Sequence, residues 1–145
     1  MFLSKGWCIF MSRIVVNMPF SKLSSQDIPR PWLPVIIINP MTGKEIKILG
    51  LIDTGADECA MPASYANMLG HNLQLGSRKE INTGNGLTSA YSHTSCIKGH
   101  NFFIQETLID FMPNLSIPLL GMKNFLNHFI LTIDYPDLSF SLRKP

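Results

Sequence analysis

The stretch Leu51–Asp57 places the sharpest constraint on how this chain can fold. The apolar run before it, Lys47–Ile52, predicts a strand that ends at Asp53. Gly55 then allows a tight turn with uncovered backbone, so the Asp53 carboxylate is presented rigidly next to accessible main chain. The alternative is a structural turn in which the carboxylate bonds to its own backbone.

One carboxylate in a cleft is a weak base without a matched acid, because it titrates near ~3.9 unless perturbed. Two carboxylates about 3 Å apart share one proton and fill both roles. The chain has one Asp-Thr-Gly motif, and Asp110, Asp134 and Asp137 offer no second copy. A two-fold homodimer would supply a second Asp53. The low charged fraction of 15% fits a chain that buries surface against its twin.

The residue pattern predicts a mostly β fold of about eight strands with a closed-barrel or sandwich-like core. We expect strands over residues 32–38, 44–52, 78–81, 87–97, 102–111, 130–135 and 138–142. Pro62–Gly70 predicts one short helix with Pro at its start and Gly at its end. Met122–Phe129 predicts a C-terminal helix that packs into the core, because its apolar residues follow helical spacing.

Three segments resemble landmarks of the retropepsin-like aspartic proteases, especially the cellular and bacterial members. Leu51–Asp57 resembles their active-site loop, and Pro118–Leu126 resembles their apolar-apolar-Gly segment and the helix after it. The hairpin Ile81–Tyr91 sits where that family has its flap. The resemblance covers roughly Pro31–Leu142, with the landmarks in order.

This resemblance implies a homodimeric aspartic endopeptidase with a retropepsin-like barrel, one short C-terminal helix and a flap hairpin. Such an enzyme would act on extended peptides or proteins and would need no cofactor or metal. Asp53 would be the catalytic carboxylate, Thr54 would hydrogen-bond to its twin across the dimer axis, and Gly55 would accept substrate backbone. Gly121 would lie beneath the loop, and the termini would form or cover the interface. The implied substrate-binding residues are Ala56 and Asp57 in the loop and Thr83, Gly84, Asn85 and Gly86 in the flap.

Two positions depart from the viral pattern. Viral members often have Arg after the Gly of the second motif, where it pairs with the second acid of the loop, whereas Met122 stands here. The flap tip is also more polar. Ala56 has no hydroxyl to hydrogen-bond the carboxylate and lower its pKa, which predicts activity reaching mildly acidic or near-neutral pH.

Composition divides the chain into an extension or linker over residues 1–28 and a protease domain over 29–145. Met1–Phe20 is apolar only in patches, too short to span a bilayer and without a signal-peptide cleavage site. We interpret it as a loosely ordered extension, with an interfacial segment or the end of a longer membrane anchor as alternatives. Self-processing within Met1–Pro31 is a hypothesis that follows from its linker-like composition.

Other function classes find little support in the sequence. The net charge is +2 without a Lys/Arg cluster, which disfavours nucleic acid binding. Cys8, Cys59 and Cys96 indicate reduced thiols, and no Cys or His spacing is typical of a metal site. Cys59 is interpreted as a core residue. The alternatives are a non-catalytic peptide-binding or dimerisation module of this fold and a membrane-associated surface protein, with a bacterial source weakly indicated.

Overall fold

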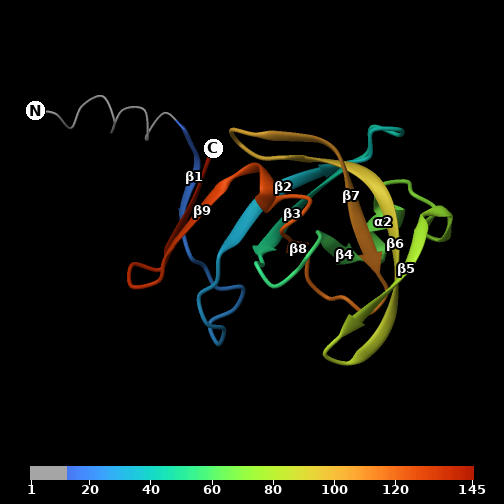
Figure 1. The fold of residues 1–145 in the computed structure, drawn as a ribbon, viewed down its shortest axis with the longest axis horizontal. Coiled ribbons are helices and arrows are strands. Elements are labelled where there is room, and N and C mark those ends of the chain that lie inside the picture. Colours follow the sequence, from blue (N-terminus) through green and yellow to red (C-terminus); the bar gives the residue numbers. More distant parts are fainter. Residues whose placement is uncertain (1–12) are drawn as a thin grey trace, which may run out of the picture.

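The computed structural model describes residues 13–145, which form two antiparallel-rich sheets (Figure 1). The larger sheet has the strand order β2-β3-β8-β4-β7-β6-β5, and the smaller has the order β1-β10-β9. The strands are β1 (Ile14–Pro19), β2 (Trp32–Ile38), β3 (Glu45–Ile52), β4 (Ala60–Pro62), β5 (Ser77–Thr83), β6 (Gly86–Lys98), β7 (Phe103–Met112), β8 (Leu119–Leu120), β9 (Ile130–Asp134) and β10 (Ser139–Arg143).

The larger sheet closes on itself because β2 pairs with β3 on one side and with β6 on the other. Inward residues of β2 such as Val35 and Ile37 are buried, while Pro34 between the strand's buried residues is exposed. This alternation follows from the two-residue period of a strand. The core also contains Phe111 and Leu120 from other strands of the barrel. The prediction of a mostly β fold is confirmed, and its core is enclosed by a barrel.

The helix predicted over Pro62–Gly70 is confirmed as α2 (Ser64–Met68). Gly70 follows it with φ +77°, a left-handed conformation that glycine adopts without steric cost. The amide of His71 donates to the Ala66 carbonyl over 2.9 Å, which closes the helix end. A 3₁₀ turn, η1 (Leu73–Leu75), then leads into β5.

The C-terminal helix predicted over Met122–Phe129 is wrong, since only η2 (Leu126–His128) forms a 3₁₀ turn there. Phe125 leaves the helical region, with φ −135°, and its ring is fully buried. The side chain of Asn124 donates to the Leu108 carbonyl of β7 and ties the segment to the barrel. The helical spacing of apolar residues therefore correctly predicted that Phe125 and Leu126 are buried, but it did not predict the backbone conformation. Met122 is also not a core residue, because it is 47% exposed.

The described end of the predicted extension belongs to a sheet. β1 pairs with β10, and Val15 and Val16 join the hydrophobic core. The following loop is closed by two hydrogen bonds between the main chains of Ser21 and Arg30, both 2.9 Å long. The predictions for residues 1–12 lie outside the described residues, and the boundary at residue 29 stays a prediction. Among residues 13–145, no helix is long and apolar enough to cross a membrane.

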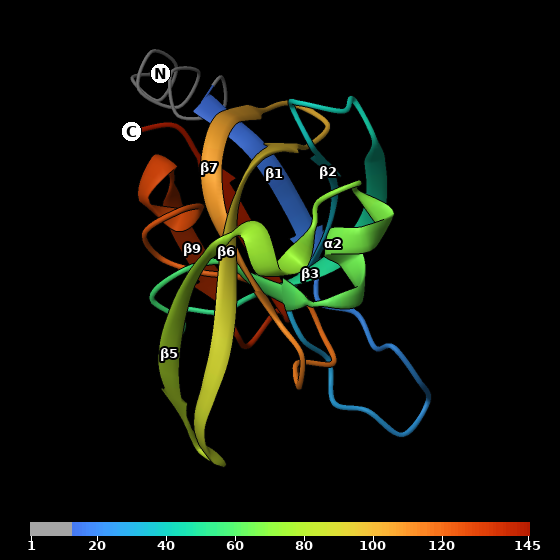
Figure 2. The ribbon, with the colours of Figure 1, turned by 90° about the vertical axis from the view of Figure 1, so that its right-hand side faces the viewer.

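β5 and β6 form a long hairpin that projects beyond the barrel (Figure 2). At its tip the Thr83 hydroxyl donates to the Gly86 carbonyl over 2.8 Å and accepts from the Asn85 amide over 3.2 Å. Gly86 has φ +103°, which explains why glycine stands there. All four tip residues, Thr83 to Gly86, are exposed.

Candidate active site

The loop that follows β3 is fixed at its entry by hydrogen bonds to β8 and the residue before it. The Leu51 amide donates to the Pro118 carbonyl over 2.9 Å, and the Asp53 amide donates to the Leu120 carbonyl over 3.1 Å. The last two residues of β3 also pair in parallel with β8. Two segments far apart in sequence therefore hold the main chain at Asp53 in one position.

The Asp53 side chain is half-buried at the start of the turn. Its Oδ1 accepts a hydrogen bond from the Gly55 amide over 2.9 Å, and the Ala56 amide donates to the Asp53 carbonyl over 3.3 Å. The structural turn considered from sequence is thus formed. It leaves Oδ2 without a hydrogen bond to any residue between 13 and 145, so the turn does not exclude a chemical role.

Gly121 lies directly beneath this loop. A Cβ at this position would be 2.8 Å from the Ala56 carbonyl oxygen and would also collide with the Glu58 carbonyl. Only glycine fits without a shift of main chain, because both neighbours are backbone atoms. This is the place that the sequence resemblance implies for Gly121.

Main-chain hydrogen bonds brace the far side of the loop. The Met122 amide donates to the Ala56 carbonyl over 2.9 Å, and the Lys123 amide donates to the Asp57 carbonyl over 2.7 Å. Met122 stands where the sequence resemblance would place an Arg side chain. In this chain the backbone of residues 122 and 123 holds the loop, while the exposed Asp57 side chain is left to solvent.

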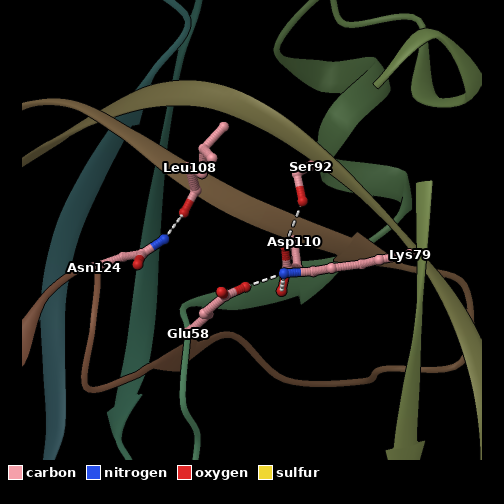
Figure 3. Close-up of polar contacts among 6 residues, drawn as sticks. All are labelled: Glu58, Lys79, Ser92, Leu108, Asp110 and Asn124. Atoms are coloured by element: carbon pink, nitrogen blue, oxygen red, sulfur yellow. Dashed lines mark hydrogen bonds and ion pairs between the residues drawn. The ribbon is translucent and has the colours of Figure 1, made fainter. Parts of the chain in front are cut away.

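A second polar cluster joins the start of β4 to the base of the β5–β6 hairpin (Figure 3). Lys79 on β5 forms ion pairs with Glu58 and with Asp110, whose Oδ2 is 2.9 Å from the Lys79 Nζ. The Ser92 hydroxyl donates to the other oxygen of Asp110 over 2.7 Å. Asp110 is only 2% exposed, so these bonds satisfy a carboxylate that water does not reach.

The pKa values of the two carboxyl groups shift in opposite directions, because the Lys79 hydrogen bond dominates at Glu58 and burial dominates at Asp110. The hydrogen bond from Lys79 lowers the pKa of Glu58 below its ordinary value of 4.5, whereas burial raises the pKa of Asp110 above 3.8. Burial lowers the pKa of Lys79, but its bonds to the two carboxylates outweigh this and raise it. Burial therefore favours the protonated form of Asp110, while Lys79 favours the charged form of Glu58.

No sequence pattern predicted this cluster. Glu58, Lys79, Ser92 and Asp110 come from four separate segments with no characteristic spacing. Only strand register places Ser92 opposite Asp110. Among residues 13–145, the side-chain hydrogen bonds at the hairpin tip stay within the tip, and none links it to the Asp53 loop.

The cysteines in the described part of the chain are structural. Cys59 and Cys96 are buried, unpaired thiols, and burial raises the pKa of Cys59 to about 12. A thiol with that pKa stays protonated at neutral pH and is a poor nucleophile. The interpretation of Cys59 as a core residue is confirmed. Within residues 13–145, no three or more His, Cys, Asp or Glu side chains are grouped so as to hold a metal.

Solved structures share this arrangement of strands and loops. A retropepsin-like aspartic protease from Rickettsia conorii superposes with a TM-score of 0.66, covering 88% of this chain and 99% of its own length at 21% identity. The chain has a retropepsin-like fold. EIAV protease, in complex with the inhibitor HBY-793, shows the same retropepsin-like fold with a TM-score of 0.50 at 21% identity. It covers 70% of this chain and 88% of its own. No protein-family model and no curated protein sequence matches the chain.

Proposed function

We propose that this protein is an aspartic endopeptidase that works as a homodimer. The observation that carries the proposal is a single Asp53 carboxylate, presented on a loop that backbone bonds brace from both sides, within a retropepsin-like fold. The solved structures it resembles are named as proteases. One carboxylate does not suffice for the chemistry, so a second chain must complete the site.

The smaller sheet offers a surface suited to that second chain. β9 is an edge strand, and Ile130 and Ile133 on it are 36% and 45% exposed. Tyr135 and Leu138 in the turn that follows are exposed as well. An apolar sheet edge with unpaired backbone groups is a ready site for strand pairing. A two-fold contact at this sheet would bury these side chains.

In the proposed dimer the two Asp53 carboxyl groups share one proton. The ionised one takes a proton from a water molecule, and the water oxygen attacks the peptide carbonyl carbon. The protonated one gives its proton to the carbonyl oxygen, which forms a tetrahedral diol. The diol collapses when a proton reaches the peptide nitrogen, the C–N bond breaks, and a carboxylic acid and an amine leave.

Substrate would lie extended between the loop and the β5–β6 hairpin, which serves as the flap. Main-chain groups at Gly55, Ala56 and Asp57 would bind the peptide backbone, with Thr54 bracing the two loops across the axis. The exposed tip residues, Thr83 to Gly86, would close over the peptide and exclude water. The cluster at Lys79 would fix the base of this flap while the tip stays free to move.

The loop Ser21–Arg30 is the proposed site of self-processing, since residues Ser21 to Ile28 are all exposed. After cleavage there, β1 would be held by its pairing with β10 and by the core residues Val15 and Val16. The test compares the N-termini of wild-type and Asp53→Asn chains after long incubation. Cleavage in the wild type alone supports self-processing, and identical N-termini contradict it.

The proposed function is tested by incubating the purified chain with a library of extended apolar peptides and identifying products by mass spectrometry. Wild-type protein should cleave them, Asp53→Asn should not, and Glu45→Gln, a change at an exposed strand residue, should behave as wild type. Binding of peptides without cleavage by the wild type would point to the non-catalytic module. Cleavage by Asp53→Asn at the wild-type rate would refute the proposal.

A further inference from the structure

An open groove of about 680 Å³ lies beside β1, and none of the candidate active-site residues lines it. Its walls come from β1, β2, β3 and the turn between β6 and β7. Most of the lining is apolar, including Val16, Leu33 and Ile48. The volume falls within the roughly 300–1,000 Å³ that is typical of small-molecule sites. The groove is therefore large enough for a ligand and separate from the proposed peptidase site.

The barrel register places two lysines in this groove on either side of one apolar residue. Ile36 of β2 pairs with Lys47 of β3 and with Lys98 of β6. Neighbouring strands are about 4.8 Å apart, so the two lysine Cα atoms are separated by roughly 10 Å. Their flexible stems allow both ammonium groups to reach one anion. His100 in the next turn also lines the groove.

The groove carries no compensating negative charge. None of its lining residues is acidic, and both ion pairs recorded within residues 13–145 belong to Lys79. The Lys47 and Lys98 ammonium groups therefore have no carboxylate partner in the described part of the chain. An apolar floor beside two unpaired cations is complementary to a molecule with an apolar tail and one anionic group.

One wall of the groove is held firmly. The ring of Phe102 contacts Phe125 and Phe129, with centroid distances of 5.6 and 5.2 Å. Its face lies so close to Gly99 that a Cβ there would collide with the ring. Phe102 is thus fixed in place before any ligand arrives, which lowers the entropic cost of binding.

We propose that this groove binds a long-chain fatty acid as its anion. The alkyl chain would lie on the apolar walls, and the carboxylate would accept hydrogen bonds from Lys47 and Lys98. The site does not depend on the proposed peptidase activity, because Asp53 and its loop take no part in it. The choice of occupant follows from the two features of the lining, because a fatty acid combines an apolar chain for the walls with a single anionic group for the two lysines.

The test measures binding of dodecanoate, tetradecanoate and hexadecanoate to the full chain at neutral pH by calorimetry, below micelle-forming concentrations. Each methylene that the groove accommodates should tighten binding about fourfold. The uncharged methyl ester should bind about tenfold more weakly. The Lys47→Gln, Lys98→Gln double variant should show the same loss, and Lys22→Gln, a change in the exposed Ser21–Arg30 loop, should bind as wild type.

Three outcomes would overturn the proposal. The first is an affinity for the acids that does not change with chain length. The second is equal affinity for acid and methyl ester, or for wild type and the double lysine variant with an unchanged circular dichroism spectrum. The third is evidence for another occupant of the groove. Either fatty acid binding would occur only after deletion of residues 1–12, or an extended apolar peptide would bind more tightly and compete with the fatty acid. Loss of cleavage in Asp53→Asn without loss of fatty acid binding would separate this site from the proposed function.

Discussion

Two carboxylates in this molecule stand in opposite situations. Asp110 is 2% exposed, accepts a hydrogen bond from Ser92 and pairs with Lys79, and burial raises its pKa. Asp53 is half-buried and accepts one hydrogen bond, from the amide of Gly55 in its own loop. The first is complete within one chain, whereas the second has an oxygen to spare and no acidic partner in the described residues.

The comparison shows that a carboxyl group with a shifted pKa can be structural and need not mark the proposed catalytic site. Perturbed carboxylates often mark catalytic centres, but structural ion-pair networks perturb them too. Here the perturbed group joins β5, β6, β7 and the start of β4, and is an architectural element. In the proposed dimer, the carboxylate facing Asp53 comes from a second chain. Within residues 13–145, the recorded ion pairs therefore lie at Lys79, away from the proposed catalytic carboxylate.

The largest expected effect is that of Asp53→Asn, which should lower the cleavage rate strongly while leaving the unfolding free energy nearly unchanged. Asp53→Asn keeps an oxygen that can accept from the Gly55 amide, so the unfolding free energy should change by no more than about 0.5 kcal/mol. Peptide cleavage should fall at least about 10³-fold, because neither acid nor base remains. Urea unfolding and a cleavage assay on the same preparation check both. A large stability loss would mean that Asp53 is structural, as Asp110 is.

The next effect concerns the support under the Asp53 loop. Gly121→Ala should push the loop carbonyls away, with a cost of about 2 kcal/mol in unfolding free energy and a roughly 10²-fold loss of cleavage rate. Gly84→Ala is the matched control for stability, because no atom lies within 4 Å of a Cβ there. Its unfolding free energy should stay within about 0.5 kcal/mol of wild type. Equal stability of both variants would show that the loop yields without cost.

Removal of the buried carboxylate should give the reverse of the Asp53 result. Asp110→Ala leaves Ser92 and Lys79 without their shared partner and should lower the unfolding free energy by about 2–3 kcal/mol. Cleavage by the fraction that remains folded should change less than tenfold. Asp27→Ala, which removes one exposed hydrogen bond from the Ser24 amide, should lose no more than about 1 kcal/mol. A cleavage loss as deep as that of Asp53→Asn would erase the distinction between the two carboxylates.

The smallest effect is a pH dependence at Glu58. Its folded pKa lies below 4.5, so its contribution to stability is present above that pH and is lost as the pH falls through the lowered pKa. Asp110 has the opposite sign, since its folded pKa lies above 3.8 and its contribution declines as the pH rises. Glu58→Gln should therefore be less stable than wild type by up to about 1 kcal/mol at neutral pH. The stability difference between the two proteins should vanish on acidification, as urea unfolding across a pH series can measure. A difference that grows as the pH falls would contradict a lowered pKa at Glu58.

Much of the barrel could be predicted from sequence because its strands carry a strong local signal. β2 has the same bounds as the predicted strand, and the helix predicted within Pro62–Gly70 ends before Gly70 as expected, although Pro62 belongs to β4 and the helix begins at Ser64. The turn at Asp53 also follows from a few adjacent residues. Local patterns succeed where the strand period and the turn chemistry agree.

The failures occur where distant contacts decide the conformation. Met122–Phe129 has helical spacing, but the amides of residues 122 and 123 bind the Asp53–Asp57 loop and Asn124 is tied to β7. β1 was assigned to an extension because nothing in its own sequence shows that β10 would pair with it. The Lys79 cluster likewise depends on register between four segments. Tertiary contacts override local propensity at all three places.

The central claim is that each chain carries half of the catalytic centre, and it is tested most directly by cleavage rate against protomer concentration. Sedimentation on the same samples identifies the range in which the chain is mostly monomeric. The account predicts that the rate in this range rises with the square of protomer concentration. A rate that stays proportional to concentration while the protein sediments as a monomer would contradict it.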